Sequence, residues 1–234
     1  MTFGSLNGLT LREIKQDLYR NIVSLRQSQD LFDDLSDDPA DWQQAVDLEL
    51  QHKPIQFQSH TPVIDRPFED AEFTSAVSFC FDNWAQSRFS RGQFGVWYGS
   101  PQIETTIYET AYHWRYGFLA DAGLENEQGL TIERRVHLVY CASALIDLLP
   151  KKTQWPELQS NDYTHCQALG EKLHREGHPG VWTPSARCKG TNAALFLPRV
   201  LSNARTHCYL TYCIDGDDIT VKRELNAVLL TIKN

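Results

Sequence analysis

The first regular pattern of hydrophobic residues lies between Thr10 and Val23. Apolar residues recur there at steps of three and four positions, at Leu11, Ile14, Leu18 and Ile22. This spacing places apolar side chains along one face of an α-helix, so the pattern predicts an amphipathic helix. A second helix is predicted from Pro39 to Gln51, because Asp38 is a good N-cap and proline is tolerated in the first helical turn.

A stretch with three prolines, from Pro54 to Pro67, separates these two patterns from the rest of the chain. Proline lacks a backbone donor and interrupts regular structure, so this stretch is predicted to be a linker. The sequence thus predicts two parts. Residues 1–65 form an N-terminal helical extension with its linker, and residues 66–234 form the main domain.

In the main domain, strand and helix patterns alternate without the regular order of a doubly wound parallel sheet. Strands are predicted at Gly95–Tyr98, Arg135–Tyr140, Cys208–Cys213 and Ile219–Glu224. Helices are predicted at Gln102–Phe118, after the N-cap signal Ser100-Pro101, and at Asp162–Glu176, before Gly177. The expected fold class is therefore α+β, a core of mainly antiparallel sheet with flanking helices, plus the N-terminal helical extension.

Composition narrows the class of protein. The chain has 234 residues, of which 41% are hydrophobic and 22% charged, as in globular proteins. No apolar run approaches the roughly 18 residues of a membrane helix, and residues 1–8 lack the pattern of an export signal. We therefore expect a soluble cytoplasmic protein, without a membrane partner, whose six cysteines are reduced thiols.

The net charge of −8 is concentrated at the front of the chain. Residues 1–70 hold 13 acidic and 6 basic side chains of the total of 30 and 22, so residues 71–234 hold 17 and 16. Nucleic-acid binding depends on basic surfaces, so no direct contact with nucleic acid is expected. The acidic front is expected to contact a partner chain or a second copy, which leaves a homo-oligomer as one possibility.

Familiar chemical motifs are absent from the sequence. It contains no G-x-G-x-x-G, no H-E-x-x-H, no G-x-S-x-G and no C-x-x-C. His174 and His178 are four residues apart, but Gly177 and Pro179 break the helix that would align them. No metal site is therefore expected.

One segment, residues 87–114, is dense in polar and aromatic side chains. Arg88 and Arg91 lie near glycines, and two such guanidinium groups could grip a phosphate. Tyr98 could stack on a flat heterocycle. Glu109 shares a helix face with Thr105 and His113, where a carboxylate could stabilise an oxocarbenium-like transition state. The spacing equally allows surface arginines, a core tyrosine and a solvated Glu109 that pairs with His113.

A second segment runs from Asp162 to Asn192 and ends in a polar loop. This loop offers hydroxyl, guanidinium and backbone donors within a few residues, at Ser185, Arg187, Gly190 and Asn192. Ser185 would need a general base to act as a nucleophile, and no Ser-His-Asp arrangement can be identified from the sequence. A binding role is therefore the favoured interpretation.

Together the two segments resemble the RES family, which is named for an arginine, a glutamate and a serine. The family's arginine, tyrosine and glutamate match Arg88-Phe89, Gly95-x-Trp97-Tyr98 and Glu109. Its serine-bearing loop matches Pro184-Ser185-Ala186-Arg187 and Asn192-x-Ala194-Leu195-Phe196. The resemblance covers roughly Arg66 to Phe196, and the front of the chain is similar to the extension of longer members.

The resemblance implies a domain similar to ADP-ribosyltransferases of the diphtheria-toxin type, with NAD as its substrate and no metal. It implies a toxin that cleaves the nicotinamide–ribose bond, as a glycohydrolase or a phosphorylase, and is neutralised by an Xre-type helix-turn-helix antitoxin. By this resemblance Arg88 holds the phosphates or the nicotinamide ribose, Tyr98 packs on the nicotinamide, and Glu109 stabilises the ribosyl cation. The other implied NAD-binding residues are Arg66, Thr164 and Ser185.

The sequence leaves two further functions open. An ADP-ribosyltransferase would pass the ADP-ribosyl group to a protein instead of water or phosphate. A non-catalytic binding module would keep the fold and tolerate the loss of Glu109. Cleavage of a glycosidic bond needs a held leaving group and a stabilised cation, and neither requires a metal or a cysteine.

Overall fold

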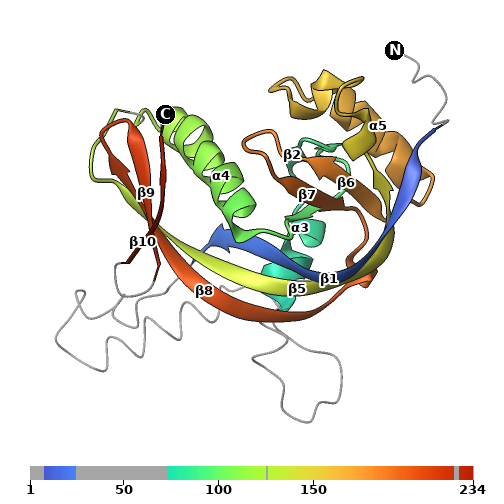
Figure 1. The fold of residues 1–234 in the computed structure, drawn as a ribbon, viewed down its shortest axis with the longest axis horizontal. Helices are drawn as coiled ribbons and strands as arrows, with labels where there is room; N and C mark the ends of the chain where they lie inside the picture. The colour runs from blue at the N-terminus through green and yellow to red at the C-terminus, as the bar shows by residue number, and fades with distance from the viewer. Residues whose placement is uncertain (1–7, 25–72, 125, 224–226, 234) are drawn as a thin grey trace, which may run out of the picture.

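The protein is described by a computed structural model that covers residues 8–24, 73–124, 126–223 and 227–233 (Figure 1). Its main feature is an eight-stranded sheet in the order β10-β9-β8-β5-β6-β7-β4, with β1 paired to β5 outside this path. Its strands are β1 (Thr10–Val23), β4 (Trp97–Gly99), β5 (Thr131–Asp147), β6 (Gly180–Pro184), β7 (Thr191–Leu195), β8 (Leu201–Asp215), β9 (Asp218–Arg223) and β10 (Ala227–Ile232).

All pairings in this sheet are antiparallel except that of β5 with β6. Two short strands, β2 (Gln86–Ser87) and β3 (Ser90–Arg91), form a separate hairpin. The expected α+β class with a mainly antiparallel sheet is confirmed. The strands predicted in the main domain are also confirmed, although β5 and β8 extend well beyond the predicted segments.

Two longer helices flank the sheet. Helix α4 (Ile103–His113) continues into the π-helical turn Trp114–Leu119, and α5 spans Thr164–Arg175. Both correspond to predicted helices. The remaining elements are short: the π-helical turn Thr74–Ser78, α3 (Phe79–Asp82), and 3₁₀ turns at Leu149–Lys151, Pro156–Gln159 and Pro198–Val200. Figure 1 shows the long strands β1, β5 and β8 curving beneath α4 and the β6–β7 hairpin.

The prediction of a helix at Thr10–Val23 is wrong, because this segment is strand β1. Ile14 and Leu18, which are buried, are four residues apart, and this spacing fits one face of a strand as well as one face of a helix. The choice is made by β5, which pairs with β1 from Thr10↔Asp147 to Val23↔Arg134. The predicted helix at Pro39–Gln51, the linker at Pro54–Pro67 and the domain boundary at residue 65 lie outside the described residues.

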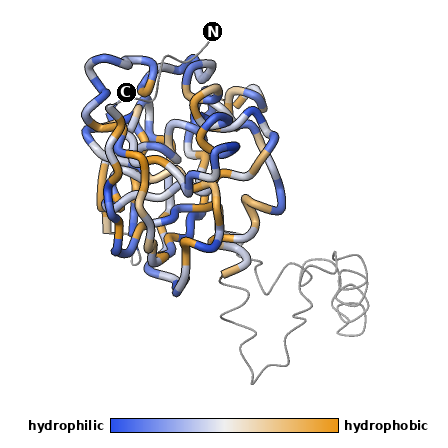
Figure 2. The backbone as a smooth tube through the Cα atoms, turned by 90° about the vertical axis from the view of Figure 1, so that its right-hand side faces the viewer, coloured by the Kyte–Doolittle hydropathy of each residue, from blue (hydrophilic) through white to orange (hydrophobic). Residues whose placement is uncertain are grey.

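Three clusters of buried side chains form the interior. One joins β1, β4 and β7 around Trp97, the second joins α5 to β6, and the third joins α4 to β8 and β9. Figure 2 shows hydrophobic and hydrophilic positions interspersed along the described chain.

None of the described helices is long and apolar enough to cross a membrane. All six cysteines are free thiols, as expected.

Helix α5 packs against the β2–β3 hairpin so closely that Gly170 has no room for a side chain. A Cβ atom at Gly170 would overlap with the backbone carbonyl of Phe89. We expect Gly170→Ala to destabilise the protein by roughly 1–3 kcal/mol through this overlap, despite the better helix propensity of alanine. The measurement is the free energy of unfolding in urea.

The matched control is Gly117→Ala, because a Cβ atom at Gly117 meets no atom within 4 Å. This control is expected to leave the free energy of unfolding unchanged or to raise it by up to about 1 kcal/mol, because alanine has the better helix propensity. Equal stability of the Gly170→Ala variant and the wild-type protein would show that the helix is not held against Phe89 as described.

Candidate active site

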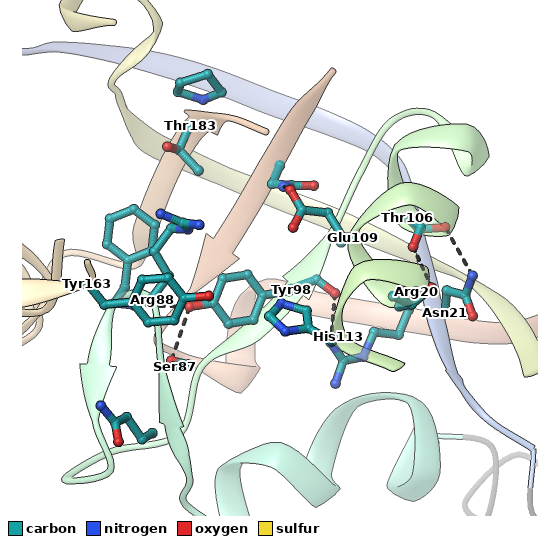
Figure 3. A pocket seen from close by; sticks show the side chains of 16 residues that line it. Arg20, Asn21, Ser87, Arg88, Tyr98, Thr106, Glu109, His113, Tyr163 and Thr183 are labelled. Carbon is teal, nitrogen blue, oxygen red and sulfur yellow. Dashed lines mark hydrogen bonds between the residues drawn. The ribbon is translucent and has the colours of Figure 1, made fainter. Parts of the chain in front are cut away.

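A cavity of about 490 Å³ opens between β1, the β2 region, β4, α4 and the end of β6. This volume lies within the roughly 300–1,000 Å³ typical of small-molecule sites. Its lining includes Arg20, Asn21, Ser87, Arg88, Tyr98, Thr106, Glu109, Thr110, His113, Tyr163, Thr183 and Asn192. Figure 3 shows the side chains of Arg88, Tyr98, Glu109 and His113 gathered around one space.

Glu109 lies in the second turn of α4 and is held by the serine loop, residues 185–190. Its Oε1 atom accepts hydrogen bonds from Ser185 Oγ at 2.6 Å, Asn192 Nδ2 at 2.8 Å and the Ala186 amide at 3.2 Å. None of these three bonds uses Oε2. The carboxylate is therefore fixed in orientation while one of its oxygens stays available on the cavity wall.

The serine loop is itself a compact turn. The Ser185 amide donates to the Gly190 carbonyl at 2.9 Å, and Ser185 Oγ accepts from the amides of Arg187 and Cys188. A Cβ atom at Gly190 would overlap with the side chain of Thr105, so glycine allows the loop to lie directly on α4. Ser185 is buried and contacts Glu109, which makes it a support for the carboxylate.

Arg88 reaches the cavity from the β2–β3 turn. Its Nη1 donates to the carbonyls of Ser160 at 2.6 Å and Leu158 at 3.3 Å, and its guanidinium carbon lies 4.5 Å from the centre of the Tyr163 ring. Both backbone bonds use Nη1, so neither occupies the Nε–Nη2 edge of the guanidinium. That edge has the geometry that grips a phosphate with two parallel hydrogen bonds.

Tyr98 lies on β4 and forms the wall next to Arg88. Its hydroxyl accepts from the Phe89 amide at 3.1 Å and donates to Ser87 Oγ at 3.1 Å. Burial raises the pKa of Tyr98 far above its usual value, so the hydroxyl stays protonated. The ring is thus anchored at its polar end, with a face available for stacking.

Arg20 of β1 is a cavity residue that the sequence analysis missed. Its Nη1 donates to the Tyr98 carbonyl at 2.9 Å, and its guanidinium carbon lies 5.6 Å from the centre of the Trp97 ring. Burial lowers its pKa from the usual value. Once Thr10–Val23 is known to be a strand, the sequence indicates that Arg20 points inward, because it lies on the same strand face as the buried Ile14 and Leu18.

Behind the cavity a buried polar network fixes α4 to the sheet. Asn21 Nδ2 donates to the Tyr212 hydroxyl at 2.8 Å, and Arg134 Nε donates to Asn21 Oδ1 at 3.0 Å. The hydroxyl groups of Thr110 and Tyr212 are 2.9 Å apart. Thr110 neighbours Glu109 in sequence, so this network holds the helix segment that carries the carboxylate.

The remaining predicted residues have different positions. Arg91 lies on the surface and pairs with Glu171 at 2.8 Å. Thr164 is exposed at the start of α5, and the preceding residue, Tyr163, lines the cavity instead. Arg66 lies outside the described residues. The described residues contain no group of three or more His, Cys, Asp or Glu side chains that could hold a metal ion.

The fold and the site together define a class, an α+β domain whose cavity sets an arginine and a tyrosine opposite a glutamate that a serine loop supports. The family model of the RES domain matches residues 64–215. This match spans most of the chain, and the chain belongs to the RES domain family.

Comparison with solved structures gives a distant likeness. The crystal structure of the M. tuberculosis MbcT-MbcA toxin-antitoxin complex is similar with a TM-score of 0.45 and 12% sequence identity, over 84% of this chain and 86% of that chain. A comparison with curated proteins gave no match.

His113, one turn after Glu109, provides a test of the electrostatics of the cavity. Burial against the cavity wall lowers its pKa from the usual 6.5, Glu109 raises it, and Arg187 and Arg88 lower it. We expect an NMR titration of the imidazole protons to give a pKa below 6.5 for His113. Glu109→Gln should lower this pKa further, because the carboxylate that favours the charged imidazole is removed. A rise in the pKa would contradict the described site.

Proposed function

We propose that this RES domain cleaves the bond between nicotinamide and ribose in NAD. The observation that carries the proposal is the fixed carboxylate of Glu109 on the wall of a cavity that also presents Arg88 and Tyr98. A stationary anion at this place favours the positive charge that develops on a ribose as its glycosidic bond breaks.

The charges of the cavity suit a dinucleotide. Two phosphates of NAD carry two negative charges, and the cavity lining contains the guanidinium groups of Arg20 and Arg88. The ring of Tyr98, fixed at its hydroxyl, offers a flat surface for the nicotinamide. The proposed roles are therefore phosphate binding by the arginines and leaving-group contact by Tyr98.

In the proposed reaction the C1′–N bond breaks and its electron pair stays with nicotinamide, which leaves as a neutral ring. Glu109 stabilises the ribosyl cation that remains. The oxygen of water or phosphate then bonds to C1′, and water releases a proton in this step. Ser185 and Asn192 act through Glu109, because both donate hydrogen bonds to its Oε1 atom.

The direct test is the release of free nicotinamide from NAD by the purified protein, followed by chromatography with and without phosphate. We expect Glu109→Gln to reduce the rate by about 100-fold or more, because a neutral amide cannot stabilise the cation. The matched control is Glu104→Gln, which changes an exposed carboxylate on the same helix and should keep the wild-type rate.

The products identify the acceptor. ADP-ribose would indicate water, a phosphorylated ADP-ribose would indicate phosphate, and a labelled protein band would indicate transfer to a protein. Intact NAD with the wild-type protein, or equal nicotinamide release by wild type and Glu109→Gln, would contradict the proposal.

We also propose that the protein is a toxin restrained by an Xre-type helix-turn-helix antitoxin, as its family membership suggests. Expression of the chain alone is expected to arrest bacterial growth, and Glu109→Gln is expected to relieve the arrest. Co-expression with a helix-turn-helix protein from the neighbouring reading frame should restore growth. Normal growth with the wild-type chain, at levels confirmed by immunoblot, would contradict a toxin.

A further inference from the structure

Residues 158–161 lie between Arg88 and the serine loop and contact both. The carbonyls of Leu158 and Ser160 accept hydrogen bonds from Arg88 Nη1. The side chains of the alternate residues contact the serine loop, since Gln159 Nε2 donates to the Ser185 carbonyl and Asn161 Oδ1 accepts from Arg187 Nη1 at 2.7 Å. Residues 158–161 thus connect Arg88, the proposed phosphate-binding residue, to the serine loop that holds Glu109.

This segment is anchored in the core by its first residue. Leu158 is fully buried in the cluster that joins α5 to β6, where Leu169 and Val181 also lie. Residues Pro156–Gln159 form a 3₁₀ turn, which leaves little backbone freedom. The segment can therefore hold Arg88 and the serine loop in fixed positions relative to each other.

Arg187 connects the serine loop to this segment and to α4. Its guanidinium carbon lies 3.3 Å from the centre of the Tyr112 ring, three residues after Glu109 on the same helix. Its Nε and Nη2 atoms are buried without a hydrogen-bond partner among the described residues. Unpaired buried donors are unfavourable, so the stack on Tyr112 and the bond to Asn161 must hold the side chain in place.

Arg187 is not part of the lining of the main cavity. It lines a separate cavity of about 150 Å³ next to Tyr108, Tyr112 and Arg115 of the same helical segment. Its backbone, by contrast, belongs to the turn in which the Arg187 amide donates to Ser185 Oγ at 3.1 Å, and this oxygen donates to Glu109. The Arg187 side chain can therefore act on the main cavity through the loop, and through its charge, which lowers the pKa of His113; Arg187→Lys keeps that charge and so isolates the effect of the loop.

We propose that Arg187 is a positioning residue. Together with Tyr112 and Asn161, it holds the serine loop in contact with Glu109 and in a fixed position relative to Arg88. The proposal rests on the proposed function for the reaction that is positioned. Without the Arg187 side chain the loop loses two of its attachments, and the donors to Glu109 Oε1 are no longer fixed. The carboxylate then loses its orientation, while the surfaces that bind NAD remain.

The first experiment measures kcat and KM for nicotinamide release by Arg187→Met. Small displacements of catalytic groups cost up to about 100-fold in rate, so we expect kcat to fall by about 10- to 100-fold and KM to change by less than about threefold. Arg187→Lys should lose nearly as much, because an ammonium group cannot reproduce the planar stack. Asn161→Asp should keep most of the activity, because it retains the acceptor for Arg187.

The control is Arg199→Met, which removes an exposed arginine away from the loop and should leave both constants unchanged. A rise in KM without a fall in kcat would show that Arg187 contacts NAD and would overturn the proposal. Unchanged constants in Arg187→Met would also overturn it. If Arg187→Met does not fold, Asn161→Ala, which removes only one hydrogen bond, should show the same fall in kcat to a smaller extent.

A second readout does not depend on NAD. Hydrogen exchange by NMR should show faster exchange, by about tenfold or more, at the amides of residues 186–188 in Arg187→Met, with unchanged amides in α5. These amides donate to Glu109 Oε1 and Ser185 Oγ. If wild type released no nicotinamide but this exchange still increased, the proposed function would fail and the positioning of the loop would stand. Unchanged exchange and unchanged kcat, in a protein that releases nicotinamide, would refute the positioning role alone.

Discussion

The pairing of β1 with β5 is the constraint on which the site depends. The two strands pair over all 14 residues of β1, from Thr10 to Val23. At Tyr19 a second, isolated bridge joins β1 to Ser100, just after β4. The path from β1 through β5, β6, β7 and β4 therefore returns to β1, and the cavity lies against this closed path. β1 also supplies Arg20 and Asn21 to the cavity wall.

The chemistry of the site follows from how Glu109 is held. Three donors meet at one of its oxygens, from the serine loop and from β7, while the network of Asn21, Tyr212 and Thr110 fixes the helix from the other side. Because the supporting groups are neutral, they orient the carboxylate without cancelling its charge. Residues that are distant in sequence therefore act as one unit around a single anion.

Several residues of the candidate site could be predicted because they lie in short, dense segments that match the RES family. The dense polar segment makes Arg88, Tyr98 and Glu109 candidates, the resemblance to the RES family implies their roles, and all three line one cavity. Ser185 was predicted as a binding residue, and the structure places it on Glu109. The sequence also predicts a helix after Ser100, and α4 is that helix, although it begins at Ile103. The Ser100 hydroxyl accepts a hydrogen bond from the Gln102 amide at 3.2 Å, just before the helix.

The sequence by itself determined the α+β class and both main helices, because these depend on local periodicity, while the arginine, tyrosine, glutamate and serine were identified by their match to the RES family. Tertiary structure alone decided that Thr10–Val23 is a strand, since a four-residue spacing fits both periods and only β5 provides the backbone partners. The same pairing decided that Arg20 enters the cavity. A side chain's neighbours across a sheet depend on register, and register is set by strands that are far apart in the sequence.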